Sequence, residues 1–186
     1  MINGINVCGL RELVQDVKDD AEEASVEYGV RLDWLRGTRT KVRAANMSVG
    51  HHRVVRDLEF EMDEPTQLAG TSAAPTPQET LLGGLAGCLA VTFVAGASAM
   101  GITLEALSVE IEGKLDLHGF LGFDSDAATG FEKLSYRFIV KGDGSEDEYR
   151  RLAEKVRIHS PNFATIANPV KLEPDLIIVE AAQESV

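Results

Sequence analysis

The segment from Thr76 to Met100 reads TPQETLLGGLAGCLAVTFVAGASAM and carries no charge after Glu79. It opens with a helix-start signature. Thr76 at the N-cap, Pro77 at the first helical position and Glu79 at the third form a capping box. Gly101 follows, and glycine is the preferred residue just past a helix end. The segment therefore predicts one long helix that ends near Gly101.

This helix needs a membrane test, because the charge-free stretch from Thr80 to Leu104 is long enough to cross a bilayer. Glycine and alanine dominate the stretch, and leucine and isoleucine are few. Glu79 and Glu105 border it in place of a basic or aromatic flank. We predict no membrane span, but a helix that protein covers on all sides.

The composition is that of a globular protein, with 44% hydrophobic and 26% charged residues among 186. Thirty acids against 18 bases give a formal net charge of -12, which argues against partners such as nucleic acid or an anionic membrane surface. Two distant cysteines and an N-terminus without a signal peptide predict a cytoplasmic protein. Neither the cysteine nor the histidine spacing indicates a metal site, and we expect no cofactor.

The remaining pattern predicts an α+β domain of mostly antiparallel sheet, preceded by an N-terminal helical extension over residues 1–24. The expected elements are a helix over Leu10–Ala24, strands within Ser25–Trp34, Thr38–Met47, His52–Met62, Leu107–Leu117 and Phe131–Val140, a helix over Glu146–Ile158, a short segment at Phe163–Ala167 and a last strand over Leu176–Val179.

Two details of this pattern bear on binding. Gly83 and Gly87 lie four residues apart on one helix face, where another backbone can approach closely. The loop Gly119–Gly130 carries the aromatic residues Phe120 and Phe123. These rings either line a pocket or anchor the loop in the core.

Cys88 also has two interpretations. A free cysteine is often a small buried hydrophobe. A reactive cysteine must be a thiolate, whose ordinary pKa of about 8.5 has to be lowered. The helix dipole does not do this, because Cys88 lies about 18 Å from the helix start. A reactive Cys88 therefore needs a cation from another element.

Two motifs resemble a known family. The first is DEPTQLAGTSAAPTPQETLLGGLAGCLAVT from Asp63 to Thr92, and the second is SPNFATIANPV from Ser160 to Val170. In them the chain resembles the OsmC-like family, which includes osmotically inducible protein C, the organic hydroperoxide resistance proteins and a broader uncharacterised branch. The resemblance covers roughly residues 26–180, so we predict an OsmC-like domain over residues 25–186.

The resemblance implies an intertwined homodimer, with two antiparallel sheets around two long central helices. In the characterised branches it also implies a thiol peroxidase. There, a cysteine at the Cys88 position attacks the peroxide and becomes a sulfenic acid. A second cysteine then closes a disulfide, which a dithiol reductant reopens. An arginine from an N-terminal strand, held by an acid, lowers the pKa of the first thiol.

Some of the family's functional positions have a clear match in this sequence, and others do not. Arg39 best matches the family arginine, with Arg36, Arg43 and Arg53 as rivals. In the organic hydroperoxide branch an acid directly follows the proline, where this chain has Gln78. Glu79 comes next, as in the wider branch, and is either the functional acid or a helix cap alone.

The family's second cysteine precedes a proline, and Ser160 stands at that position. Serine cannot close a disulfide, and Cys8 lies outside the matched region. The function we expect is therefore reduction of organic hydroperoxides through Cys88, with an external thiol as reductant. The alternative is a non-catalytic, small-molecule-binding or stress-related dimer with an inert Cys88. Its cleft would be lined from Gln78, Leu82, Leu85, Phe120 or Phe123.

Overall fold

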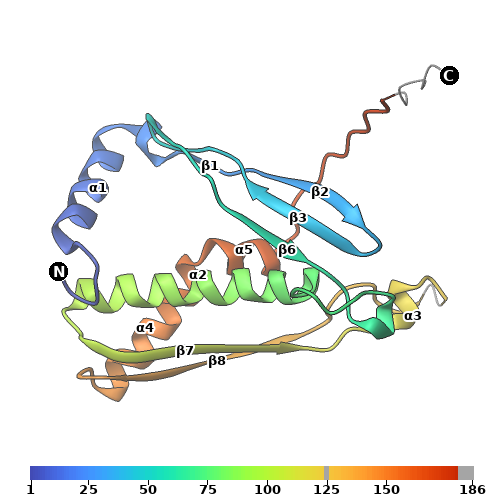
Figure 1. Cartoon of the computed structure of the whole chain (residues 1–186). Helices are drawn as coiled ribbons and strands as arrows, with labels where there is room; N and C mark the ends of the chain where they lie inside the picture. The colour runs from blue at the N-terminus through green and yellow to red at the C-terminus, as the bar shows by residue number, and fades with distance from the viewer. Residues whose placement is uncertain (124–125, 180–186) are drawn as a thin grey trace.

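The computed structural model describes residues 1–123 and 126–179. Its centre is the long helix α2 (Pro77–Met100), which lies on the antiparallel hairpin of β7 (Leu104–Gly113) and β8 (Leu134–Gly142) (Figure 1). Helices α4 (Glu146–His159) and α5 (Pro161–Ala167) also pack against α2. The fold is α+β, as predicted.

The N-terminal half forms an arm of two small antiparallel sheets on the other side of α2 (Figure 1). One sheet contains β1 (Val26–Glu27), β4 (Met47–Val49) and β5 (His52–Val54), and the other contains β2 (Val30–Arg36), β3 (Arg39–Ala44) and β6 (Glu59–Met62). Each of the three predicted strands is thus broken in two, at 28–29, 45–46 and 55–58. The breaks divide one ribbon of strands into two sheets.

Short helices join these parts. Helix α1 (Val7–Asp19) begins three residues earlier than predicted, because Asn6 caps it by accepting a hydrogen bond from the Gly9 N–H. A 3₁₀ turn, η1 (Ala21–Ala24), replaces the last part of the predicted helix. A second turn, η2 (Thr66–Leu68), precedes α2, and α3 (Leu117–Phe120) follows β7.

The ends of α2 confirm the sequence prediction. The Thr76 hydroxyl accepts a hydrogen bond from the Glu79 N–H at 3.1 Å, and the Glu79 carboxylate accepts one from the Thr76 N–H at 2.7 Å. Gly101 ends the helix with a φ of 80°, a left-handed conformation that favours glycine. Both caps are local, so the sequence alone fixes the extent of this helix.

One face of α2 forms the core. Leu85, Leu89, Phe93 and Ala97 recur every fourth residue and are buried. They pack with Leu152 and Val156 of α4, Ile102 and side chains of β7 and β8. Phe93 lies 5.0 Å from Phe138, measured between ring centroids. Within one chain, the core is therefore a layer between α2, α4 and the hairpin.

The opposite face of α2 stays exposed along Gly83, Gly87 and Val91. A Cβ added at either glycine would meet nothing within 4 Å among the described residues. By length and composition α2 would be able to cross a membrane. The single chain exposes 14001 Å², whereas a compact monomer of its mass exposes about 8,700 Å². One chain thus leaves a large apolar surface without cover.

The last predicted strand is wrong for the single chain. Leu176–Val179 form no strand, and their side chains are more than three-quarters exposed. A strand needs a neighbour to accept and donate its backbone hydrogen bonds. The described part of the chain places none beside this segment.

Candidate functional site

The site begins at Cys88, which is half-buried on α2. The hydroxyl of Ser160 lies 3.1 Å from the Cys88 sulfur and donates a hydrogen bond to it. Ser160 itself is 1% exposed. The structure therefore brings Cys88 and Ser160 into direct contact, although 72 residues separate the two in sequence.

Two helix ends hold Ser160 in place. Its N–H donates to the Val156 carbonyl at 2.9 Å and closes α4. Its hydroxyl oxygen accepts from the Phe163 N–H at 3.3 Å and caps α5. Because the N–H of Phe163 occupies one lone pair, the hydroxyl proton is free to point at sulfur.

An apolar cavity of about 460 Å³ is lined by residues that neighbour this pair along the chain, although neither Cys88 nor Ser160 lines it. Its walls come from α2, from the start of β8 and from α5, and include Leu81, Leu85, Phe131, Leu134, Tyr136, Phe163, Ile166 and Ala167. Leu85 lies nearly one turn before Cys88, and Phe163 is the residue that bonds Ser160.

The other residues predicted for this cleft lie elsewhere. Gln78 and Phe120 line a separate cavity of about 250 Å³ near the start of α2. Phe123 is 78% exposed and lines neither cavity. The predicted pocket is thus divided in two, and Leu85 is the predicted residue that borders the larger of these two cavities.

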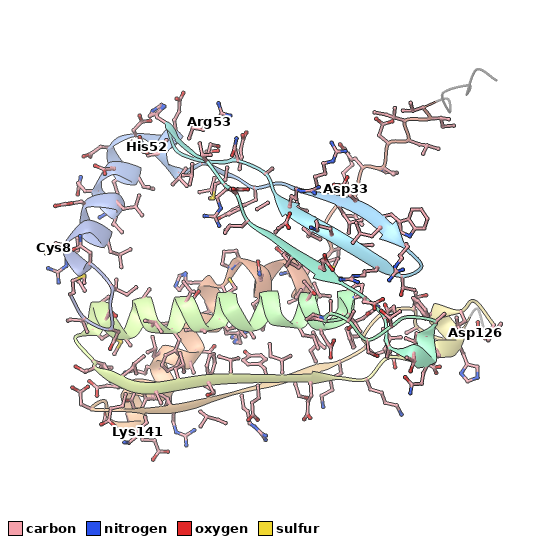
Figure 2. All side chains as sticks on the ribbon, viewed as in Figure 1. Cys8, Asp33, His52, Arg53, Asp126 and Lys141 are labelled. Carbon is pink, nitrogen blue, oxygen red and sulfur yellow. The ribbon has the colours of Figure 1, made fainter. Side chains whose placement is uncertain are left out.

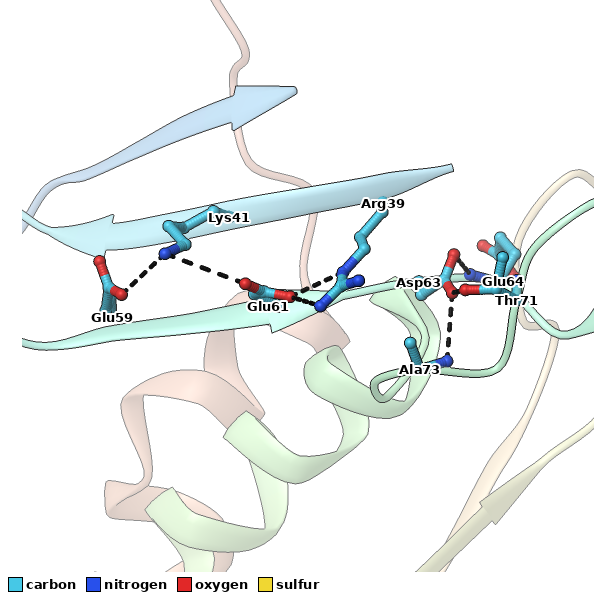
Figure 3. Close-up of polar contacts among 8 residues, drawn as sticks. All are labelled: Arg39, Lys41, Glu59, Glu61, Asp63, Glu64, Thr71 and Ala73. Atoms are coloured by element: carbon cyan, nitrogen blue, oxygen red, sulfur yellow. Dashed lines mark hydrogen bonds and ion pairs between the residues drawn. The ribbon is translucent and has the colours of Figure 1, made fainter. Parts of the chain in front are cut away.

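Arg39 lies on the arm. Its Nε and Nη2 atoms donate to Oε2 of Glu61 at 2.8 and 2.6 Å (Figure 3). Lys41 donates to Glu59 at 2.8 Å, and its Nζ lies 3.9 Å from Glu61. Arg43 pairs with Asp33. Within the described residues of one chain, no hydrogen bond or ion pair joins an arginine to the sulfur.

The acid that pairs with Arg39 is therefore Glu61, which no sequence motif indicated. Its position follows from strand pairing, since Lys41 lies opposite Glu61 and Arg39 is two residues away on the same face. Glu79 is engaged in the capping box of α2, and its hydrogen bonds from the Thr76 backbone hold the pKa of the Glu79 carboxyl below its usual value. Cys88 lies nine residues further along the helix, on the opposite face.

Asp63 is a second acid near the site that the sequence pattern did not indicate. It is 1% exposed, and its carboxylate accepts hydrogen bonds from the Thr38 hydroxyl, from the hydroxyl and N–H of Thr71 and from the Ala73 N–H. The Thr38 and Thr71 bonds hold the pKa of Asp63 far below its usual range. This carboxylate ties the β2–β3 turn, through Thr38, to the loop that leads into α2. Figure 3 shows its contacts with Thr71 and Ala73 in that loop. A lone Asp before Glu-Pro gives no sequence signal for this role.

Cys8 is exposed near the start of α1 (Figure 2), and neither cysteine forms a disulfide. Residues 1–5 attach to the far end of α2, where the Asn3 side chain donates to the Ser98 hydroxyl and the Ile102 carbonyl and accepts from the Leu104 N–H. Among the described residues, no group of three His, Cys, Asp or Glu side chains is arranged to hold a metal ion.

The sequence model of a family described as OsmC-like protein matches residues 70–175, more than half of the chain. The chain belongs to the OsmC-like family. The match includes both Cys88 and Ser160 but not the arm. The predicted domain boundary after residue 24 therefore stays a prediction.

Solved structures of OsmC-like proteins share the fold. An OsmC-like protein from Mycoplasma pneumoniae is 18% identical, with a TM-score of 0.61 over 76% of this chain and 87% of its own. One of unknown function from Vibrio cholerae is 13% identical, with a TM-score of 0.58 over 75% and 92%. An organic hydroperoxide resistance protein from Legionella pneumophila is 20% identical, with a TM-score of 0.50 over 75% and 88%. No curated protein matches the sequence.

Proposed function

We propose that this protein is a one-cysteine thiol peroxidase that reduces organic hydroperoxides at Cys88. Membership of the OsmC and organic hydroperoxide resistance family indicates a role in the response to peroxide or stress. The observation that carries the finer proposal is the Ser160 hydroxyl, 3.1 Å from the sulfur. It supplies a hydrogen-bond donor where the characterised members have their second thiol.

The chemistry proceeds in two stages. The Cys88 thiolate attacks the outer oxygen of the hydroperoxide, the O–O bond breaks, and the alkoxide leaves as an alcohol after taking a proton. Cys88 is now a sulfenic acid. An external thiol condenses with it to release water and form a mixed disulfide, and a second external thiol displaces Cys88 as thiolate. The two external thiols end as a disulfide, so the electrons balance.

The cation for this site comes, in this proposal, from a second copy of the chain. Arg39 and Glu61 are paired on an arm that extends away from the core of its own chain (Figure 1). Two observations favour a homodimer. The single chain exposes 14001 Å², well above the about 8,700 Å² of a compact monomer of its mass. The face of α2 at Gly83 and Gly87 is also open. The partner's arm would then cover α2 and present the guanidinium to Cys88.

This arrangement also accounts for the apolar character of α2. OsmC-like proteins are soluble, so a second protein chain, rather than lipid, is the expected cover for the helix. We extend this to a cytoplasmic location, where a reduced Cys88 and a supply of external thiols coexist.

The test uses cumene hydroperoxide and the full-length protein. We expect stoichiometric sulfenic acid at Cys88, trapped with dimedone and located by mass spectrometry. Arg39→Ala should slow the reaction about 10- to 100-fold, a typical effect of losing charge stabilisation at a reacting group. Arg43→Ala removes an arginine from the same face of β3 and should react at the wild-type rate. An unreacted Cys88 in the presence of excess peroxide would refute the proposal.

The alternative is a binding protein with an inert Cys88, which the apolar cavity of about 460 Å³ favours. In that case an apolar probe such as 1-anilinonaphthalene-8-sulfonate would bind beside Leu85, and Cys88 would react with neither peroxide nor a small maleimide. Peroxide reactivity that an apolar probe inhibits would instead assign the cavity to the peroxidase.

A further inference from the structure

The N-terminal helix α1 has an apolar face that its own chain leaves uncovered. Leu10, Leu13, Val14 and Val17 recur at helical spacing and share one side of the helix. No residue of α1 is buried, and Leu13 and Val14 are 42% and 49% exposed. A helix of 13 residues is marginal in water by itself and owes its stability to the packing of its apolar face. This face therefore needs a cover from outside the single chain.

Hydrogen bonds attach both ends of α1 to the rest of the molecule. Before the helix, the Asn3 side chain donates to the Ile102 carbonyl and accepts from the Leu104 N–H, both at 2.8 Å. After it, the Gly50 N–H of the β4–β5 turn donates to the Ser25 carbonyl at 2.8 Å. Helix α1 thus spans from the end of α2 to the far end of the arm (Figure 1). The two attachments fix the position of its apolar face.

The charges of α1 argue against a lipid surface as the cover. A helix that lies on a membrane usually carries a polar face rich in lysine and arginine. The charged residues of α1 are three acids and two bases, Glu12, Asp16, Asp19, Arg11 and Lys18. The chain as a whole has a formal net charge of -12, which an anionic membrane repels. The cover that suits this face is protein.

Helix α2, to which α1 is attached, lacks a cover too. Gly83 and Gly87 face open space, and Val91 is 68% exposed. The surface that the single chain exposes beyond that of a compact monomer is several times the about 800 Å² that one partner buries in a standard interface. An interface of that extent reaches past α2 to the elements fixed at its ends. In a two-fold dimer, each copy covers the same surfaces of the other.

We infer that the apolar face of α1 packs against the second copy of the chain, so that one partner covers both α1 and the open face of α2. The inference rests on the homodimer of the proposed function. It adds a contact outside the matched family domain, because α1 precedes residues 70–175.

Sedimentation equilibrium of the full-length protein tests this contact. Leu13→Gln/Val14→Gln makes the face polar without changing the net charge, and glutamine forms helices more readily than valine. Because the dimer loses four covered aliphatic side chains, we expect its dissociation constant to rise at least about 100-fold. Glu12→Gln/Gln15→Glu exchanges two exposed residues on the opposite side of α1 at constant charge and should keep the wild-type value.

Thiol labelling gives a second readout that does not depend on weakening the dimer. In a protein with Cys8→Ser and Cys88→Ser, Val14→Cys or Glu12→Cys supplies a single thiol on α1. We expect a bulky maleimide to label Val14→Cys at least tenfold more slowly than Glu12→Cys in the dimer. In one chain alone Val14 is 49% exposed, so the two thiols would react at similar rates.

The outcomes separate this contact from the proposed function. A wild-type protein that sediments at 20.1 kDa removes the homodimer and this contact with it. A dissociation constant that is unchanged in Leu13→Gln/Val14→Gln overturns the contact alone and leaves the homodimer in place. Equal labelling of Val14→Cys and Glu12→Cys in a dimeric protein does the same.

Discussion

Replacing Ser160 by cysteine should convert the site into a two-cysteine site. The Ser160 oxygen lies 3.1 Å from the Cys88 sulfur, so a thiol on the same Cβ reaches bonding distance after a small rotation about χ1. Treatment of Ser160→Cys with one equivalent of cumene hydroperoxide should first form a sulfenic acid at Cys88. The introduced thiol then attacks it, releases water and closes an intramolecular disulfide.

The size of the effect follows from the geometry. A disulfide across 72 residues removes chain entropy worth about 4.4 kcal/mol from the unfolded state. In the reduced form, the variant loses the hydroxyl cap of α5, which costs about 1 kcal/mol. The reduced variant should therefore be less stable than wild type by about 1 kcal/mol, and the oxidised variant more stable by about 3 kcal/mol.

Urea unfolding with and without a phosphine reductant measures both values, and non-reducing peptide mapping locates the bond. Ser145→Cys is the matched control, because Ser145 also caps a helix but lies at the other end of α4, about 20 Å along its axis. It should lose its cap without gaining a disulfide. A folded Ser160→Cys protein that forms no bond to Cys88 after peroxide treatment would contradict this prediction.

Three further predictions follow from other contacts. Asn3→Ala removes three half-buried hydrogen bonds at the end of α2 and should lower the free energy of unfolding in urea by about 2 kcal/mol; an unchanged midpoint would show that residues 1–5 do not hold the helix. Hydrogen bonds lower the pKa of Asp63 in the folded protein. The contribution of Asp63 to stability is therefore fully present at a pH above the pKa of an unfolded aspartate, about 3.9, and is lost as the pH falls below that value. Asp63→Asn should therefore be less stable than wild type at pH 7 and lose less stability between about pH 5 and pH 3, and parallel pH profiles would contradict this. Gly87→Leu places a side chain on the open face of α2, and sedimentation should show a change from twice 20.1 kDa for wild type to 20.1 kDa for the variant; a monomeric wild type would remove the basis of the proposed dimer.

The sequence determined what depends on neighbours a few residues apart. The capping box, the proline at the first helical position and Gly101 fixed both ends of α2. Alternation and helical periodicity located β7, β8 and α4 to within a few residues. The motif around Cys88 led to the correct family. In each case the information is local or is carried by a run of residue types, so it survives without knowledge of the packing.

The tertiary structure decided what depends on residues far apart in the chain. The contact between Cys88 and Ser160 arises because the α4–α5 junction packs against the middle of α2. The pairing of Arg39 with Glu61 depends on the register of β3 and β6. Leu176–Val179 has the composition of a strand, but a strand exists only when another backbone lies beside it, and one chain supplies none in its described part.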